Sequence, residues 1–245
     1  MTTGRFDGQL ALVTGAGSGI GAASARRLAA DGASVIVADV DEASGTSVSD
    51  AIGGRFARLD VGDPDAWDSL VADAGPIRLA HLNAGIAMGE YPVRIEQSSV
   101  EAYRRVMRVN TDGVFFGARA LVNGMAERGG GAIVATASLA GLGPHADDPV
   151  YAATKHFVVG LVRSLAPPLA ELGITINAVC PGGVATALLR TIGHPDPLPD
   201  QPFMEPAEVA DAVATLLAGD ETGEAYMVRA GSGSERFVFP GQRRG

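Results

Sequence analysis

Cysteine is nearly absent from the sequence, which contains Cys180 and no other. One thiol cannot form an internal disulfide, so a fold held by disulfides is excluded and a reducing compartment is favoured. The residues on either side, Ala178-Val179 and Pro181-Gly182, are apolar or small. We interpret Cys180 as a buried core thiol, and a catalytic thiol is the alternative.

Long apolar runs and an excess of positive charge are also missing. No stretch reaches the ~18 apolar residues that a membrane-spanning helix requires, and residues 1–9 contain no apolar signal core. The formal net charge is −9, and an acidic surface repels nucleic-acid phosphates and anionic membranes. We therefore expect a cytoplasmic protein that has no nucleic-acid or membrane partner, and we predict no metal site.

The chain does contain a regular alternation of short apolar runs and helical patterns. The runs that we expect to be strands are 10–14, 34–38, 55–59, 79–82, 132–137, 175–179 and 225–229. The expected helices are 19–31, 42–51, 64–73, 99–128, 149–171 and 206–218. Each run is apolar on nearly every residue, as in strands covered on both faces. This predicts an α/β fold, a doubly wound parallel sheet in a single domain over 1–245, with ligands at the carboxyl ends of the strands.

A proline-rich stretch at 187–206 interrupts the alternation. Its prolines are Pro195, Pro197, Pro199, Pro202 and Pro206. Such a segment cannot form a regular helix throughout. Because it follows a strand end at which a ligand should bind, we predict a substrate lid, and an ordinary surface loop is the alternative.

A glycine-rich turn joins the first expected strand to the first expected helix. Its sequence is Thr14-Gly15-Ala16-Gly17-Ser18-Gly19-Ile20-Gly21. Glycine permits a sharp turn and leaves no Cβ between the backbone and a ligand. The N–H groups at the helix start can then bind a pyrophosphate, helped by the helix dipole. In an alternating α/β chain this turn predicts a dinucleotide site with contacts from Gly15, Ser18, Gly19, Ile20 and Gly21.

The second expected strand ends at Asp39, 18 residues after Gly21. A carboxylate there can accept hydrogen bonds from the adenosine ribose, and it repels the extra phosphate of NADP. The next residue is Val40, and Arg26 and Arg27 lie on the preceding helix, where they can face away. We therefore expect NAD rather than NADP. The alternative role of Asp39, as a turn or cap residue, is compatible with binding.

Two further strand ends carry residues suited to a cofactor. Asp60 and Val61 close the third strand, where Asp60 could receive the adenine amino group. Asn83, Ala84 and Gly85 close the fourth, where small residues permit close approach. We predict that all five contact the cofactor.

The segment Asp148-Pro149-Val150-Tyr151 has the pattern of a helix start, with Asp148 as N-cap and Pro149 at the first helical position. Tyr151 and Lys155 are four residues apart and share one face of that helix. Lys155 is the only lysine beside 18 arginines, at a position that favours a compact point charge. An ammonium and the positive ring of an oxidised nicotinamide can together lower the pKa of Tyr151 from its usual ~10. We predict that Tyr151 is a general acid/base; an exposed helix pair is the alternative.

Two polar residues complete the expected catalytic group. Ser138 closes the strand 132–137, so its hydroxyl can donate to a substrate oxygen on the ligand side of the sheet. Asn110 lies inside the expected helix 99–128, where asparagine competes with the backbone for hydrogen bonds. It could hold a water that links Lys155 to solvent. The alternatives are an ordinary turn serine and a locally satisfied asparagine.

Together these residues resemble the short-chain dehydrogenase/reductase family over about residues 8–230. The resemblance rests on the order and spacing of the glycine-rich turn, Asn83-Ala84-Gly85, Asn110, Ser138, Tyr151-x-x-x-Lys155 and Pro181-Gly182. It implies a Rossmann-like fold with a seven-stranded parallel sheet and a Ser–Tyr–Lys–Asn catalytic group. It also implies nicotinamide contacts from Pro181, Gly182, Val184 and Thr186. A homodimer or homotetramer joined through the 99–128 and 149–171 helices is implied as well.

The sequence departs from the family pattern at three places. Leu82-Asn83 replaces the usual pair of asparagines, which puts one contact that braces the backbone in doubt. Pro167-Pro168 interrupts the expected helix 149–171, which puts the usual tetramer in doubt. The tail 231–245 lacks the usual ending and is interpreted as a flexible end or an extra interface piece.

These predictions describe an NAD-dependent oxidoreductase that transfers a hydride between a secondary alcohol or ketone and nicotinamide. An NADPH-dependent carbonyl reductase and a non-catalytic nucleotide-binding scaffold are the alternatives. By position, Ser138, Leu139, His145 and Leu188 are expected to contact the substrate, although a surface role for His145 is the alternative. Leu188, Leu189 and Phe203 indicate an apolar lid and hence a hydrophobic small-molecule substrate.

Overall fold

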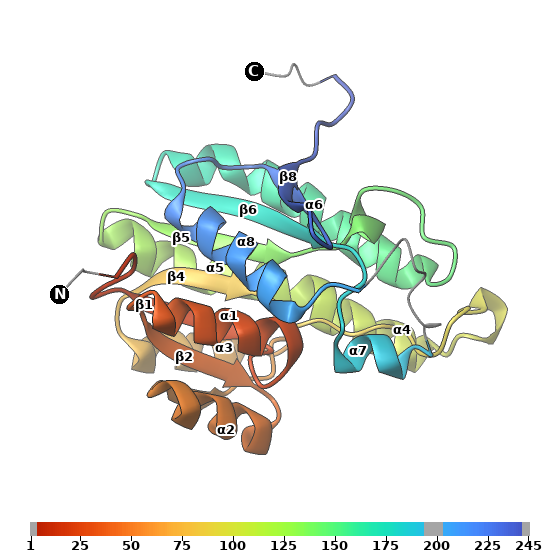
Figure 1. The fold of residues 1–245 in the computed structure, drawn as a ribbon, viewed down its shortest axis with the longest axis horizontal. Coiled ribbons are helices and arrows are strands. Elements are labelled where there is room, and N and C mark those ends of the chain that lie inside the picture. The colour runs from red at the N-terminus through yellow and green to blue at the C-terminus, as the bar shows by residue number, and fades with distance from the viewer. Residues whose placement is uncertain (1–3, 194–202, 242–245) are drawn as a thin grey trace.

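The computed structural model describes residues 4–193 and 203–241. A central sheet has the strand order β3-β2-β1-β4-β5-β6-β7-β8 and is layered between helices (Figure 1). The strands are β1 Leu10–Thr14, β2 Ser34–Asp39, β3 Arg55–Arg58, β4 Ile77–Leu82, β5 Gly131–Thr136, β6 Ile174–Pro181, β7 Ala225–Arg229 and β8 Gly233–Arg236. The α-helices are α1 Gly19–Ala30, α2 Glu42–Ile52, α3 Pro64–Ala74, α4 Val100–Met107, α5 Gly113–Glu127, α6 Pro149–Ala170, α7 Ala187–Thr191 and α8 Pro206–Ala218. The predicted α/β doubly wound class is confirmed.

Each face of the sheet buries its own apolar layer. On one face Leu12 and Ile133 pack with Trp67 of α3 and with residues of α5 and α6. On the other face Val13 packs with Leu28 of α1 and with residues of α2 and α8. In Figure 1, α1 and α8 accordingly lie in front of the sheet, with α5 and α6 behind it. Because successive strand residues point to opposite faces, runs that are apolar at every position suit this two-sided burial.

The prediction of seven parallel strands is wrong in number, since β8 adds an eighth strand that pairs antiparallel with β7. The tight return is possible because Gly231 and Gly233 adopt positive φ angles of 68° and 67°. Beyond β8 the backbone N–H of Phe237 donates to the carbonyl of Ala225 at 2.8 Å. Residues 233–237 of the tail are thus bound to the sheet, which corrects for this part the interpretation of the tail as a flexible end.

The expected helix 99–128 is divided. Between α4 and α5 the chain widens into a π-helical turn, Arg108–Asp112, and this turn carries Asn110. Such turns are rare inside helices and occur often at functional sites. Periodicity alone could not show the division, because the apolar pattern continues through it.

The expected interruption of helix 149–171 does not occur, and α6 continues through Pro167 and Pro168 to Ala170. Both prolines are exposed and lie near the end of the helix. A proline lacks an N–H donor, and the loss matters less where few turns follow.

The strand order reverses beside β1, where β2 lies on one side and β4 on the other. In open α/β sheets, ligands bind in the crevice outside the carboxyl ends of the strands at such a reversal. The ends that meet there are Thr14, Asp39, Leu82 and Thr136. The topology therefore places the predicted cofactor residues at one edge of the sheet.

The predicted lid 187–206 is described in part. Its first residues form α7, whereas 194–202 lie outside the described residues. On the far side of that gap, the N–H of Met204 donates to Gly183 at 2.9 Å, and Ala185 donates back to Met204 at 2.8 Å. The two described ends of the segment are thus held close to the carboxyl end of β6.

None of the helices within 4–193 and 203–241 is both long and apolar enough to span a bilayer. In the same ranges no group of three or more His, Cys, Asp or Glu side chains is arranged to hold a metal ion.

A histidine is buried in the middle of the sheet. His81 of β4 has no solvent exposure, and its Nε2 lies 2.8 Å from the hydroxyl of Thr136 on β5. Burial lowers the pKa of His81 to about 3, because the charged ring would lose its hydration. The folded protein therefore holds His81 neutral, whereas the unfolded chain protonates it near pH ~6.5.

This burial predicts acid sensitivity. Since the pKa of His81 is lower in the folded state, its contribution is complete above pH ~6.5 and is lost as pH falls toward 3. The free energy of unfolding should fall by about 1.4 kcal/mol per pH unit in this range through His81 alone. Urea unfolding at pH 7, 6 and 5 should show a shallower decline for His81→Gln. The control His156→Gln, at an exposed position, should keep the wild-type slope; equal slopes for all three proteins would contradict the assignment.

Candidate active site and cofactor cleft

A cavity of about 670 Å³ opens at the carboxyl ends of the strands. All predicted cofactor residues except Gly21 line it, and so do the predicted substrate residues Leu139, His145 and Leu188. Of the predicted catalytic group, Ser138, Tyr151 and Lys155 line the cavity, whereas Asn110 lies behind its wall. Chain topology thus brings together residues from 15 to 192.

The glycine-rich turn is shaped by close contacts. Gly15 has a φ of 61°, and a Cβ there would lie 2.9 Å from the Cα of Ala84. A Cβ on Gly21 would overlap the carbonyl oxygen of Gly15. Gly21 is therefore required for the shape of the turn rather than for lining the cavity. Gly19 is also close to another segment, since a Cβ at this position would lie 3.1 Å from Cγ2 of Thr186.

The start of α1 faces the cavity. Ser18 occupies the N-cap, and within the described part of the chain its side chain makes no capping hydrogen bond. The first N–H groups of a helix have no partner inside the helix and carry the positive end of its dipole. The start of α1 can therefore hold an anionic group such as a pyrophosphate.

The carboxylate of Asp39 braces the same turn. It accepts hydrogen bonds from the N–H of Gly17 at 2.8 Å and from the N–H of Asp41 at 3.0 Å. Asp39 also lines the cavity, so its predicted turn role and its predicted position toward a ligand coexist. Among the described residues that line the cavity, the arginine is Arg108 and the lysine is Lys155.

Asp60 is already engaged on both oxygens. Oδ1 accepts from the N–H of Gly62 at 3.0 Å, and Oδ2 lies 2.8 Å from Nη2 of Arg108. The salt bridge is half exposed, so water screens it. Asp60 and Val61 lie at the end of the cavity that Asp39 also faces.

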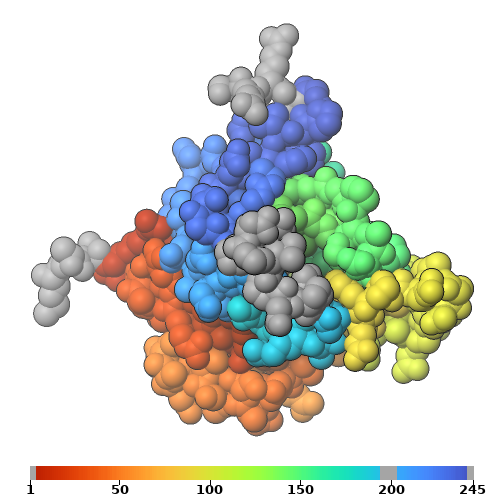
Figure 2. Space-filling view, turned by 45° about the vertical axis from the view of Figure 1, so that its right-hand side comes forward, coloured from red at the N-terminus to blue at the C-terminus, as the bar shows by residue number. Residues whose placement is uncertain are grey.

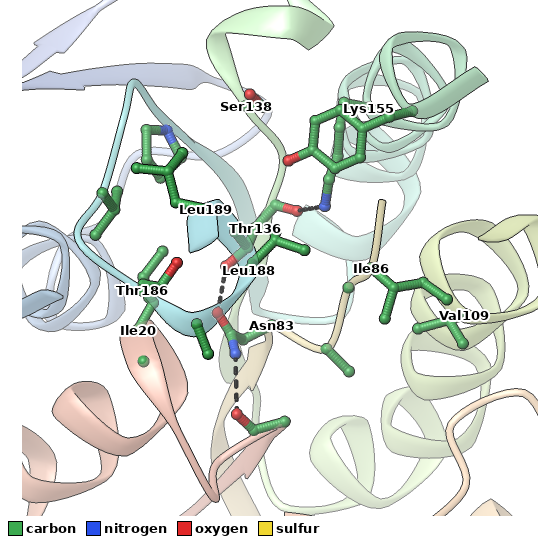
Figure 3. A pocket seen from close by; sticks show the side chains of 18 of the residues that line it. Ile20, Asn83, Ile86, Val109, Thr136, Ser138, Lys155, Thr186, Leu188 and Leu189 are labelled. Carbon is green, nitrogen blue, oxygen red and sulfur yellow. Dashed lines mark hydrogen bonds between the residues drawn. The ribbon is translucent and has the colours of Figure 1, made fainter. Parts of the chain in front are cut away.

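The hydrogen bonds of Thr136 join the two sides of the cavity (Figure 3). Its carbonyl accepts from Nζ of Lys155 at 2.9 Å, and its hydroxyl donates to Oδ1 of Asn83 at 3.2 Å. Nδ2 of Asn83 in turn donates to the carbonyl of Thr14 at 3.0 Å. The doubt raised by Leu82-Asn83 is removed, because Asn83 alone braces the turn while Leu82 is buried in the core.

The hydroxyl of Thr136 also fixes the proton on His81. Since that hydroxyl donates to Asn83, it accepts from Nε2–H of His81. Nδ1 of His81 then has no hydrogen-bond partner within the described residues. Sequence reasoning did not select Thr136 or His81, because both lie inside apolar strands.

Asn110 is satisfied by the protein. Its Oδ1 accepts from the N–H of Ile86 at 2.8 Å, and its Nδ2 donates to the carbonyl of Ile86 at 2.8 Å and to the hydroxyl of Thr154 at 3.0 Å. These partners lie 24 and 44 residues away in sequence, so Asn110 is satisfied by distant segments and not locally within its helix. A water held between Asn110 and Lys155 stays a prediction.

Ser138, Tyr151 and Lys155 meet at the inner end of the cavity. Burial raises the pKa of Tyr151 to about 12, opposed by a side-chain hydrogen bond with Ser138. Burial also lowers the pKa of Lys155 to about 8. Nζ of Lys155 lies 5.4 Å from the centre of the Tyr151 ring. The lowering of the Tyr151 pKa was expected from Lys155 together with an oxidised nicotinamide, and it stays a prediction; in the chain alone, burial is the largest influence and raises this pKa.

Two predicted residues around this end have structural explanations. Asp148 is the N-cap of α6 as predicted, since its Oδ1 accepts from the N–H of Tyr151 at 2.9 Å. Cys180 has no exposed surface, and burial raises the pKa of its thiol to about 12. The interpretation of Cys180 as a core thiol is confirmed.

The wall of the cavity also contains residues that sequence analysis missed. They are Ile86, Tyr91, Val109 and Ile192. The rings of Tyr91 and His145 meet edge to face, with centroids 5.4 Å apart. The yellow segment that carries Tyr91 lies beside the cyan α7 in Figure 2, and the N–H of Tyr91 donates to the carbonyl of Ile192 at 2.9 Å. Phe203, which the lid prediction named, is not among the residues that line the cavity in the described structure. Its ring lies close to Gly183.

Comparison with known proteins agrees with this geometry. The short chain dehydrogenase family model matches residues 9–196. The chain is 38% identical to a cyclohexanol dehydrogenase of Acinetobacter sp. (strain SE19), over 91% of this chain and 94% of the relative. It is 34% identical to a 3-alpha-(or 20-beta)-hydroxysteroid dehydrogenase of Mycobacterium tuberculosis (strain ATCC 25618 / H37Rv), over 94% and 91% of the two chains.

A solved structure gives the same result. The 3-ketoacyl-(acyl-carrier-protein) reductase from Brucella melitensis, complexed with NADH, superposes with a TM-score of 0.86 and is 32% identical. The match covers 92% of this chain and 98% of that one. The chain therefore belongs to the short-chain dehydrogenase/reductase family and is an NAD(P)-dependent oxidoreductase acting on CH–OH groups.

Proposed function

We propose that the protein is an NAD-dependent dehydrogenase of neutral secondary alcohols, with Tyr151 as its general acid/base. The observation that carries this proposal is the meeting of Tyr151, Ser138 and Lys155 in the same cavity as the glycine-rich turn. A nicotinamide cofactor supplies the hydride acceptor, or the hydride donor in the reverse direction. The residues of this chain must hold that cofactor, orient the alcohol and move one proton.

The cleft fits such a cofactor. The glycines keep Cβ atoms away from the turn, and the start of α1 offers N–H groups to a pyrophosphate. Asp39 would hold the adenosine ribose, and its negative charge disfavours a ribose that carries a phosphate. Pro181, Gly182, Val184 and Thr186 would hold the nicotinamide end, since they line the cavity at the end of β6.

In the proposed reaction, Tyr151 removes the hydroxyl proton of the alcohol as the hydride leaves carbon. With a pKa near 12 in the chain alone, the phenol is protonated at neutral pH. A positive charge beside it is needed to favour the phenolate, and Lys155 together with the oxidised cofactor provides positive charge. Ser138 can donate a hydrogen bond to the substrate oxygen while charge develops there.

The proposed substrate is a neutral ring alcohol. The cavity beside Tyr151 is lined by the apolar side chains Ile86, Leu139, Leu188, Leu189 and Ile192. Arg108, the arginine among the described lining residues, lies beside Asp60, at the end of the cavity proposed to hold the adenosine and not at the proposed substrate end. The names of two relatives, cyclohexanol dehydrogenase and hydroxysteroid dehydrogenase, also refer to ring alcohols.

Replacing Tyr151 with Phe tests the chemistry. Tyr151→Phe removes the proton acceptor and should lower kcat for NAD-linked cyclohexanol oxidation by at least ~10²-fold, the usual contribution of a general base. Binding of NADH should change little. Tyr103→Phe, which alters an exposed tyrosine on α4, is the matched control. A Tyr151→Phe enzyme as active as the control would remove the proposed role of Tyr151.

A fluorescence titration with NADH and NADPH tests the cofactor preference. NADH should bind at least ~10-fold more tightly, because Asp39 repels the phosphate of NADPH. Asp39→Asn removes the charge and should narrow this difference. The opposite preference in the wild type would favour the NADPH-dependent carbonyl reductase. Cofactor binding without turnover of any alcohol would favour the non-catalytic scaffold.

We also propose a homodimer or homotetramer joined through α5 and α6. Phe115 of α5 and Phe157 of α6 are 46% and 41% exposed, and these helices are in contact. Exposed aromatic side chains on adjacent helices are typical of a protein interface.

Phe115→Asp and Phe157→Asp should shift the sedimentation coefficient toward that of the monomer. Leu172→Asp, at a residue 44% exposed beyond the end of α6, should leave it unchanged. A monomeric wild type would refute the interface.

A further inference from the structure

Asp148 does more than cap α6. The residue has no exposed surface, and its two carboxylate oxygens accept from two different segments. Oδ1 accepts from the N–H of Tyr151 at 2.9 Å, and Oδ2 accepts from the N–H of Met88 at 3.0 Å. Met88 lies 60 residues away in sequence. One buried carboxylate therefore ties the start of the helix that carries Tyr151 to a distant loop.

That loop, residues 86–93, forms part of the cavity wall. Ile86 and Tyr91 line the cavity, and Met88 packs with Val106 and Val150 in a small buried cluster. The N–H of Val93 donates to the carbonyl of Asp147 at 2.7 Å. The loop is thus hydrogen-bonded to the segment just before α6 at two residues, Asp147 and Asp148. The bond to Asp147 involves its backbone carbonyl, and the bond to Asp148 involves its side chain.

The double contact requires a carboxylate. An ionised carboxylate is acceptor-only on both oxygens and can receive two N–H groups at once. Serine caps a helix with one oxygen, and asparagine presents one oxygen and one NH₂ donor. Either replacement keeps the cap of α6 but leaves the N–H of Met88 without its acceptor, where an unsatisfied buried donor is costly.

We propose that Asp148 is a positioning residue that fixes the wall formed by Tyr91 relative to the phenol of Tyr151, and so limits the size of the ring substrate. Tyr91 and Tyr151 line the same cavity, and the ring of Tyr91 packs edge to face against His145, which also lines it. A wall at this position bounds the space in which the carbinol carbon can approach Tyr151. This inference rests on the proposed oxidation of ring alcohols at Tyr151.

The test compares Asp148→Ser and Asp148→Asn with Asp147→Asn. Asp147 is the adjacent carboxylate, is exposed, and accepts from the N–H of Val93 through its backbone carbonyl, so its variant controls for the loss of one charge. In the Asp148 variants, KM for cyclohexanol should rise about 10-fold, because the wall that confines the small ring is no longer held in place. With saturating substrate kcat should stay within about 3-fold, and the dissociation constant of NADH should be unchanged. The preference for cyclohexanol over a bicyclic secondary alcohol should fall.

Hydrogen exchange measures the contact without activity. Peptides covering residues 86–93 should exchange faster in Asp148→Ser than in the wild type or in Asp147→Asn, while peptides from the start of α6 should keep their protection. An Asp148→Ser protein that is folded, with wild-type exchange at 86–93 and wild-type KM, overturns the proposal. A uniform rise in exchange and a lower melting temperature with no change in the KM ratio of the two alcohols also overturns it, because the role is then structural only. If the wild type oxidises no ring alcohol, the proposed substrate fails, and the exchange experiment still decides whether Asp148 holds the loop.

Discussion

The hydrogen bonds of Thr136 are the interaction on which the site depends. This residue at the end of β5 receives Lys155 on its carbonyl and binds Asn83 and His81 through its hydroxyl. Asn83 then holds the backbone of Thr14 at the entrance to the glycine-rich turn. The glycine-rich turn and the side of the cavity that carries Lys155 are therefore connected through one buried residue. Hydrogen bonds are electrostatically stronger inside a protein than in water, so this network keeps the geometry of the site fixed before any ligand binds.

Much of this arrangement could be predicted from the sequence. Strands that are apolar at every position, such as Leu10–Thr14, must be covered on both faces, and this fixed the class of fold. Glycine at 15, 19 and 21 and the four-residue spacing of Tyr151 and Lys155 are local patterns whose chemistry can be read without coordinates. Asp148 was recognisable as a cap because its partner, the N–H of Tyr151, lies only three residues away.

The parts that could not be predicted depend on contacts between distant segments. Thr136 and His81 look like ordinary members of apolar strands until β4 and β5 pair and bring them together. Tyr91 belongs to the wall only because residues 86–93 fold against α7 and the start of α6. The strand β8 is short and polar, so its pairing with β7 follows from the turn at Gly231 and Gly233 rather than from an apolar pattern. The pKa of Tyr151 in the chain alone could not be predicted either, because burial, which a sequence does not display, raises it to about 12.

The single lysine has a consequence for chemical labelling. Lys155 is the only side-chain amine of the protein, and it lies at the inner end of the cleft with 3% of its surface exposed. Because burial lowers its pKa to about 8, a sizeable fraction of this amine is uncharged, and therefore nucleophilic, in mildly alkaline solution. Among side-chain amines, a small acylating reagent thus has one target, and it must enter the cleft to reach it. All other Lys or Arg positions of the chain are arginine. Lys155 is therefore the only side-chain amine whose acylation can report whether the cleft is occupied.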